Sequence, residues 1–452
     1  MRSIHGSNHA ASCAARTWVR HLRRHTGFLA VAIFAAAVTT AQAIAAGPFD
    51  GRVAISAQDL VEAVLSRNLG LPARTQALEA ARARAARAGA LDDPMFSYGL
   101  APGLIDRSSN IYGQRLELSQ QLPWPGKLAL REQAARHEAE ASHTDVETLR
   151  LDLAERAHAL FAEWFLVHRA THINESNQKL WQDVADIAER RYSVGRAQQS
   201  DVLQARIEFH RLKQSYITLE RERRNVQAEV NALLGQAPDM PLPPPADLPP
   251  PQPADVPIAA PGQAVAGQPA LARLKAEIAA AESKVGLADL DFFPDFAIRA
   301  GYDGVMDMPE QRAMVGISLN IPFDQGKRRA ARDEAKAELR GLEAQLSDQE
   351  IALEAELQKA VDRAEEGRRM LSVFNEQLLP LAEQNIDAVV SGYQSGSGDF
   401  LALLTAQKAR ADIEYEAAAA LADYHRSLAR IERLTAAQAA AGETTSRLGG
   451  PK

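Results

Sequence analysis

The side chains best suited to chemistry in this 452-residue sequence are histidines whose spacing fits one face of a helix. His168 and His172 are four residues apart, a spacing at which two imidazoles can share one metal ion. His143 and His158 fall on a similar face, but ~22 Å separates them along a helix axis, so they cannot complete a site with that pair. Stacked histidines on a helix rich in Glu and Arg are more typical of a solvated surface. We therefore predict no resident metal and no cofactor.

The sequence also lacks the motifs of common enzymes. It contains no G-x-S-x-G, no H-E-x-x-H and no phosphate-binding loop. The only cysteine, Cys13, lies in a basic segment before an apolar run at residues 28–38 and two Ala-x-Ala segments. This order predicts a signal peptide at residues 1–45 that is removed with Cys13; a membrane anchor is the alternative, but the apolar run is short for one. The net charge of -7 argues against nucleic-acid binding. We predict an exported protein that is not an enzyme.

The same series of elements occurs twice, which predicts two structural repeats at residues 46–237 and 269–436. Each repeat is expected to run helix, strand, strand, long helix, helix. In the first repeat the elements cover residues 59–90, 95–100, 112–123, 127–191 and 198–234. In the second they cover residues 269–290, 295–302, 314–323, 327–391 and 399–434. Pro380 should bend the second long helix. Residues 238–268 are expected to form a proline-rich extended linker, and residues 437–452 a flexible tail.

Matching residues also recur at fixed offsets between the repeats. Lys127 and Lys327 are 200 positions apart. Four further pairs recur at an offset of 201: Tyr192 and Tyr393, Gly195 and Gly396, Leu203 and Leu404, Ala205 and Ala406. Four matches at one offset, inside the same order of elements, favour an internal duplication over chance.

The predicted strands alternate between apolar and polar residues. Val315, Ile317 and Leu319 would point to one face of a sheet, whereas Gly316 and Ser318 would point to the other. The apolar face can lie either on a protein core or in lipid, and the strands alone favour the core. The long helices argue against a single soluble core, because a helix of 65 residues spans ~98 Å, a length that no such core requires. Their apolar residues recur with the spacing of a coiled coil.

Taken together, the motifs give a family resemblance. Residues 56–434 resemble the TolC-type outer-membrane efflux proteins through a repeated Y-x-x-G-x7-L-x-A signature at Tyr192 and at Tyr393. L-P-W-P-G-K at residues 122–127, I-P-F-D-Q-G-K at residues 321–327 and F-P-D-F at residues 293–296 add to it. The P-W-P-G-K wording is most similar to the heavy-metal (cobalt-zinc-cadmium) branch.

The resemblance implies a mostly α-helical homotrimer in the outer membrane. Each subunit would give four strands to a twelve-stranded β-barrel, and the helices would continue it as a long α-helical barrel in the periplasm. The far turns would dock a periplasmic adaptor protein that links the duct to an inner-membrane pump of the RND type. The residues implied at that tip are Tyr192, Val194, Gly195, Arg196, Tyr393, Ser395 and Gly396. The segments at residues 101–110 and 303–312 become external loops.

The resemblance also suggests an entrance and two membrane exits. Family members often carry acids just after the second turn, but here those positions are Ala402 and Thr405, which leaves Asp201 and Asp399 as the acids of the pore entrance or as helix caps. The exits from strand to helix are expected to use Pro123, Trp124, Gly126, Lys127, Pro322, Gly326 and Lys327. Prolines end the strand ladder, Gly126 frees the turn, Lys127 suits the headgroup boundary and Trp124 the interface.

The expected function is a passive exit duct without its own energy source. Heavy-metal cations are the first expected substrate, by family wording only, with drugs or small toxins second and proteins of a type I system third. A soluble periplasmic coiled-coil scaffold is the alternative of another class.

Overall fold

The computed structural model describes residues 48–49, 51–101, 113–252, 261–304, 312–395 and 397–448. The chain divides into two compact units, residues 1–52 and 53–452, and the second unit holds every helix and strand named below. The predicted leader, most of the two predicted external loops and Gly396 lie outside the described residues.

The described residues are mostly helical, with one small antiparallel sheet, as the sequence predicts. The elements are α3 (Ala57–Arg67), α4 (Gly70–Ala88), β1 (Met95–Ala101), β2 (Gly113–Leu122), α5 (Lys127–Ser193), α6 (Gln199–Leu233), α7 (Pro261–Val265), α8 (Pro269–Leu290), β3 (Asp295–Asp303), β4 (Ala313–Asn320), α9 (Gln325–Val373), a π-helical turn (Phe374–Leu378), α10 (Leu379–Ser395) and α11 (Phe400–Leu448). None of the described helices is both long enough and apolar enough to cross a membrane.

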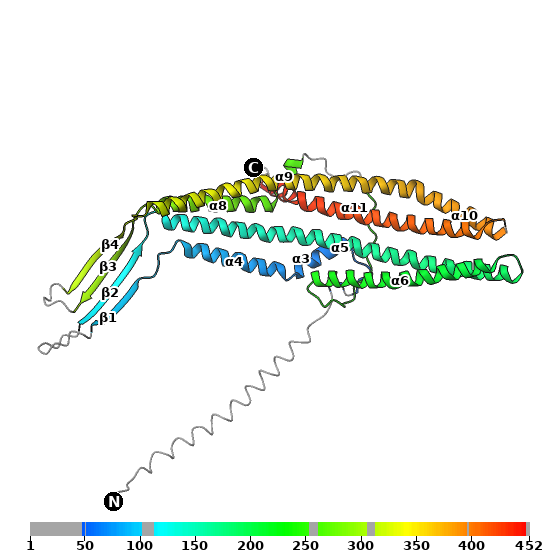
Figure 1. The fold of residues 1–452 in the computed structure, drawn as a ribbon, viewed down its shortest axis with the longest axis horizontal. Helices are drawn as coiled ribbons and strands as arrows, with labels where there is room; N and C mark the ends of the chain where they lie inside the picture. Colours follow the sequence, from blue (N-terminus) through cyan, green and yellow to red (C-terminus); the bar gives the residue numbers. More distant parts are fainter. Residues whose placement is uncertain are drawn as a thin grey trace, which may run out of the picture. The chain divides into compact units, whose positions relative to one another are not determined.

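The sheet has the strand order β1-β2-β3-β4, and every neighbouring pair is antiparallel. β1 and β4 are therefore its two edges. Figure 1 shows the sheet at one end of this unit, while the α5–α6 and α10–α11 turns lie at the other. The 67 residues of α5 span ~100 Å between the two ends.

The first predicted helix is wrong in one respect, because it is two helices. α3 begins at a capping box in which the Ser56 hydroxyl and the Asp59 carboxylate accept from each other's backbone amides. It ends at Asn68, whose backbone is extended at φ -62° and ψ 124°. The Asn68 side chain accepts from the Gly70 amide and donates to the Leu233 carbonyl at 2.8 Å. This amide group replaces the lost helical bonds and ties the break to the end of α6.

The second long helix is interrupted where the sequence predicts a bend. Pro380 has no N–H to donate to the preceding turn, and its ring clashes with a regular α-helical path. The five residues before Leu379 form a π-helical turn, in which the Leu379 amide reaches back to the Phe374 carbonyl. The widened turn accommodates the proline while α9 and α10 remain continuous in sequence.

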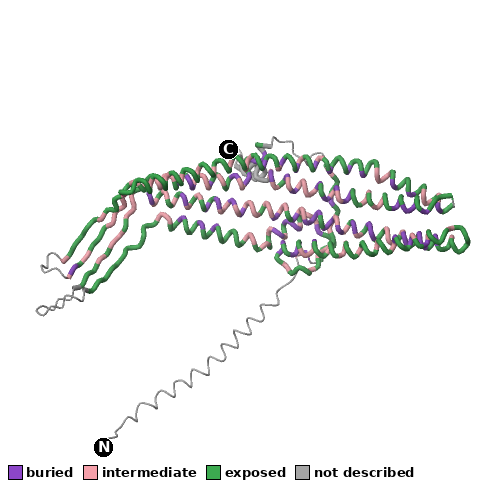
Figure 2. Tube along the Cα trace, in the orientation of Figure 1, coloured by how far each residue is buried: buried purple, intermediate pink, exposed green. Residues whose placement is uncertain are grey.

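The helices pack through small residues. α5 contacts α3, α4, α6, α8 and α11, while α9 packs on α7, α8 and α11. Ala157, Ala364 and Ala422 are completely buried. A Cβ on Gly367 would come within 3.3 Å of Tyr424 Cβ, so α9 and α11 approach closely at this glycine. Figure 2 shows the buried residues along the helices, whereas the strands are largely exposed.

The proline-rich segment after α6 lies on the helices. The Trp164 indole N–H donates to the Pro243 carbonyl at 3.0 Å, and Asn231 Nδ2 donates to the Met240 carbonyl at 2.8 Å. Pro245 forms a parallel bridge with Ile55. Because proline carbonyls still accept hydrogen bonds, an extended segment of this composition can be fastened along its length.

Candidate functional site

The register of the sheet puts its apolar side chains on one common face. Directly paired residues point to the same side, and one row across the sheet is Phe96, Leu118, Ala300 and Val315. Ten large apolar side chains of this face are between 36% and 82% exposed: Phe96, Tyr98, Leu100, Leu116, Leu118, Ile298, Tyr302, Val315, Ile317 and Leu319. No described helix covers this face, and Figure 1 shows the helices beyond the strand ends.

The opposite face of the sheet is mainly polar. Arg115 Nη2 lies 2.6 Å from Asp303 Oδ2 across the β2–β3 pair, and Arg299 Nε lies 3.8 Å from Glu117 Oε1. Cross-strand pairs of opposite charge contribute to the stability of a sheet. The sheet thus separates an apolar face from a mainly polar one.

The first strand-to-helix joint is densely bonded. Gly126 has φ 95°, which frees the turn as the sequence predicts. The Lys127 side chain is only 3% exposed, and its Nζ lies 2.9 Å from Asp291 Oδ1 and 3.0 Å from Asp295 Oδ1. The Trp124 amide donates to the same Asp295 carboxylate at 2.8 Å. The ammonium of Lys127 is therefore buried against two acids instead of being exposed.

The second joint uses different contacts. Gly326 lies in the first turn of α9, which begins at Gln325, so the conformation of Gly126 is not repeated there. The Asp324 carboxylate caps the helix by accepting from the Lys327 amide at 3.0 Å. Lys327 is exposed, and so is Phe323, at 86%. Pro322 lies before this turn. Both joints therefore contain a proline followed by glycine and lysine, but their backbone conformations and contacts differ.

The two far turns lie side by side. In the first, Gly195 adopts φ 73° and its amide donates to the Tyr192 carbonyl at 2.9 Å, while the Arg196 amide donates to the Arg191 carbonyl at 2.8 Å. Val194 is 66% exposed beside them. In the second, Ser395 ends α10 and Gly398 folds back so closely that a Cβ there would lie 2.7 Å from the Gly392 backbone. Both turns therefore depend on glycine.

Arg191 joins these turns, and local sequence patterns give no signal for it. Its guanidinium donates to the Tyr393 carbonyl and lies 4.6 Å from the centre of the Tyr393 ring. Tyr393 is buried in an apolar cluster that also contains Trp181 and Phe400. Burial, followed by the charge of Asp201, raises the pKa of the Tyr393 phenol. The predicted tip residues Tyr192, Gly195, Tyr393 and Ser395 thus come together at one end of the helical part.

The two predicted entrance acids differ in their surroundings. Asp201 is half-buried in the first turn of α6, where the helix N-terminus favours a carboxylate. Asp399 is exposed, directly before α11, and its carbonyl accepts from the Leu403 amide. Both acids thus lie at the start of a helix, where the helix dipole favours a carboxylate.

The two histidines of the predicted pair lie in different surroundings. His168 packs edge-on against the Trp164 ring, with 4.3 Å between centroids, whereas His172 is exposed. Among the described residues, no three His, Cys, Asp or Glu side chains are placed to hold a metal.

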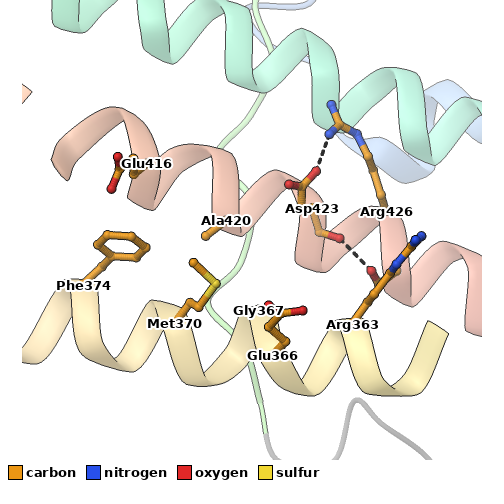
Figure 3. Close-up of a pocket in the computed structure, with 10 residues that line it drawn as sticks. Arg363, Glu366, Gly367, Met370, Phe374, Glu416, Ala420, Asp423 and Arg426 are labelled. Atoms are coloured by element: carbon orange, nitrogen blue, oxygen red, sulfur yellow. Dashed lines mark hydrogen bonds and ion pairs between the residues drawn. The ribbon is translucent and has the colours of Figure 1, made fainter. Parts of the chain in front are cut away.

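A pocket of about 520 Å³ opens between α9 and α11 beside the π-helical turn. Figure 3 shows Phe374 and Met370 on one wall and Glu416, Ala420 and Asp423 on the other. The Arg426 guanidinium pairs with the Asp423 carboxylate within the lining. No histidine lines this pocket. Three acids do, Glu366, Glu416 and Asp423, but among the described residues no three such side chains are placed to hold a metal ion together.

Comparison with known proteins places this arrangement in context. The family model described as outer membrane efflux protein matches residues 60–236 and 260–437. No curated protein sequence matches the chain.

Solved structures give a consistent likeness. The outer-membrane channel OprN is 22% identical, with a TM-score of 0.73 over 86% of this chain and 91% of that one. CusC is 17% identical, with a TM-score of 0.74 over 84% and 91%. The outer membrane protein VceC of Vibrio cholerae is 18% identical, with a TM-score of 0.71 over 84% and 96%.

Proposed function

The chain belongs to the outer membrane efflux protein family, and on that premise we propose that it is the exit duct of a tripartite efflux system. Members of this family are non-enzymatic outer-membrane channels that extend into the periplasm. They work with a periplasmic adaptor and an inner-membrane pump. In our proposal the pump supplies the energy and this chain provides a passive path.

The observation that carries the proposal is the uncovered apolar face of the sheet. Ten large apolar side chains on one face are more than a third exposed, while the opposite face carries ion pairs. A membrane strand has this alternation, with apolar side chains toward lipid and polar ones toward a hydrated lumen. Trp124 and Phe323 lie directly beyond the strands, where aromatic side chains favour the lipid–water interface.

The sheet edges support a trimer. β1 and β4 each have one strand neighbour, and an open edge in lipid leaves backbone amides and carbonyls without partners. If β4 of one copy pairs with β1 of the next, three copies of four strands close a twelve-stranded barrel. Closed barrels abolish the edges altogether. The helical part then continues the wall of the duct into the periplasm.

The two far turns are the proposed adaptor-docking tip. Tyr192, Val194 and Arg196 belong to the first turn, and Tyr393 and Ser395 lead into the second; Gly396, which we also assign here, lies outside the described residues. Exposed Val194 offers an apolar contact at this end. Asp201 and Asp399 are the proposed entrance acids.

Heavy-metal cations are our first proposed substrate, supported by the P-W-P-G-K wording alone. A duct does not need a resident metal site, because tight binding slows exit. The test is a deletion strain compared with its complemented parent for tolerance of zinc, cobalt, cadmium, copper and drugs. Sensitivity to drugs without sensitivity to metals would replace the metal assignment with a drug or small-toxin duct.

Membrane fractionation tests the duct itself. We expect the full chain in the outer-membrane fraction, as a trimer that migrates intact in detergent without heating and as subunits after heating. Recovery as a soluble periplasmic protein without detergent-stable trimers would instead support the coiled-coil scaffold.

A further inference from the structure

We infer that Lys127 is a positioning residue that fixes the angle at which the sheet leaves the helices. This inference rests on the proposed trimeric duct. It concerns the joint where β2 passes into α5 and α8 passes into β3, two connections that lie side by side.

The ammonium of Lys127 is buried between the ends of several elements. Lysine is almost never fully buried unless it is paired, and this side chain is 3% exposed. One partner, Asp291, is the residue directly after α8, and the other, Asp295, is the first residue of β3. Lys127 is itself the first residue of α5. A single cation therefore links the start of one helix to the end of another and to the start of a strand.

Further contacts fix the connecting residues themselves. The Trp124 amide donates to Asp295, so the carboxylate holds both the ammonium and the backbone of the β2–α5 turn. The Trp124 ring stacks on Phe293 and on Phe296, with centroid distances of 4.9 and 5.6 Å. Gly126 lies against Leu290, because a Cβ at this position would come within 3.2 Å of Leu290 Cδ1. Both short connections are thus held by ionic, hydrogen-bonded and aromatic contacts at once.

Lys327 shows that a lysine directly after a strand exit is not always buried between acids. It holds the matching place in the sequence, yet its side chain is exposed and only its backbone amide is bonded, to Asp324. The β4–α9 joint is instead attached to Asp291 through Arg328, whose Nε donates to the Asp291 carbonyl at 2.7 Å. The two lysines therefore differ in burial and in bonding, although each directly follows a glycine at a strand exit.

A rigid joint matters for the closure of the proposed barrel. In a closed barrel the strand tilt and the stagger between strands are linked, so every subunit must deliver its strands at the same angle. Errors at one joint would displace β1 or β4 from the neighbouring copy. A buried cation with fixed partners holds an angle better than an exposed loop, because moving it would leave a charge without its partners.

The test compares Lys127→Met with Lys327→Met in the full chain, expressed in the outer membrane. We expect Lys127→Met to lower the yield of heat-sensitive trimer by at least about tenfold, whereas Lys327→Met leaves it within about twofold. Hydrogen exchange of the membrane-embedded trimer provides the second measurement. In Lys127→Met, exchange should rise at residues 122–126 and 291–296 while the α5–α8 contact keeps its protection, which a general loss of folding would not do.

Asp295→Asn keeps the test decisive if Lys127→Met does not fold. It removes one charge from the joint and leaves Asp291 beside Lys127, so we expect the same local rise in exchange with a smaller loss of trimer. Trimer yield and local exchange equal to those of Lys327→Met, in either variant, would overturn the inference. A wild-type chain that forms no outer-membrane trimer would refute the proposed function instead, so the two failures are distinguishable.

Discussion

Placing a positive charge on either face of the sheet tests which face meets lipid. Ile317 and Ser318 are adjacent in the middle of β4 and, because side chains alternate along a strand, they point to opposite faces. Ile317 is 72% exposed on the apolar face, opposite Ile298 of β3. Ile317→Lys and Ser318→Lys therefore add the same charge at the same depth, and only the face differs.

The expected difference follows from the cost of a charge in lipid. A lysine on the lipid face near the bilayer midplane costs about 2–4 kcal/mol, whereas a substitution on the lumen side changes selectivity more than stability. A trimer contains three copies of the position, so the whole assembly would lose about 6–12 kcal/mol if the copies act independently. Ser318→Lys should cost less than about 1 kcal/mol per subunit.

The assay is the temperature at which trimers dissociate in detergent, measured together with their abundance in purified outer membranes. Ile317→Lys should sharply reduce both quantities, and Ser318→Lys should leave both near the wild-type value. Equal behaviour of the two variants would refute the assignment of the apolar face to lipid. The reverse order, with Ser318→Lys the more damaging, would assign lipid to the opposite face.

Three further predictions concern the helical part. Trp164 is 1% exposed, and its indole N–H donates to the Pro243 carbonyl. Trp164→Ala should therefore destabilise the helices by about 3–5 kcal/mol in denaturant unfolding, whereas Ile351→Ala, at an exposed position, should cost less than about 0.5 kcal/mol. Equal unfolding midpoints of the two variants would contradict the role of the buried indole. Gly195 has φ 73° and open space around it, so Gly195→Val should strain the turn by about 1–2 kcal/mol. This variant should impair efflux while trimers persist, and Gly195→Asn should impair efflux less, because asparagine tolerates this conformation. Unchanged resistance in Gly195→Val would count against the docking tip. Burial lowers the pKa of His158, against the charge of Glu432 and with a smaller effect of His425. Burial, followed by the charge of Arg223, lowers the pKa of His168. The fold therefore favours the neutral imidazoles: their contribution to stability is complete above the unfolded pKa of about 6.5 and is lost as the pH falls through their folded pKa values. The thermal midpoint of the helices should therefore fall on acidification below that pH, and His158→Gln with His168→Gln should flatten the fall; an unaltered pH profile would show that other groups control it.

The sequence predicts element positions well because this chain marks them locally. Pro123 and Pro125 end a strand by withholding amide donors, and Gly195 marks a turn that needs positive φ. The alternation of apolar residues predicts the two faces of each strand, and the observed register aligns those faces across the sheet. Pro380 likewise predicts an irregularity in the second long helix, and a π-helical turn lies directly before Leu379 and Pro380.

Contacts between distant residues escape the same patterns. One partner of Lys127 is Asp295, 168 positions away, and nothing in the turn around Lys127 indicates that a cation there is buried. Arg191 reaches the Tyr393 carbonyl across 202 positions, and a backbone carbonyl as acceptor leaves no trace in residue type. Asn68 looks like an ordinary helix residue until the carbonyl of Leu233 is brought beside it. In each case packing of the helices creates the site, and the local sequence only permits it.

The energy of the exposed apolar face is the strongest argument against a soluble scaffold. Fully burying one large apolar side chain stabilises a protein by about 1.5–3 kcal/mol. The ten side chains of this face are partly exposed, so leaving them in water forfeits on the order of 10 kcal/mol, comparable with the whole stability of a typical domain. A soluble scaffold would need a second apolar surface of matching size on each sheet, as well as a partner strand at β1 and at β4. In the proposed barrel, lipid would cover the face and identical copies would pair with both edges, which meets the two needs without any further protein and leaves the ion-paired face to line the path.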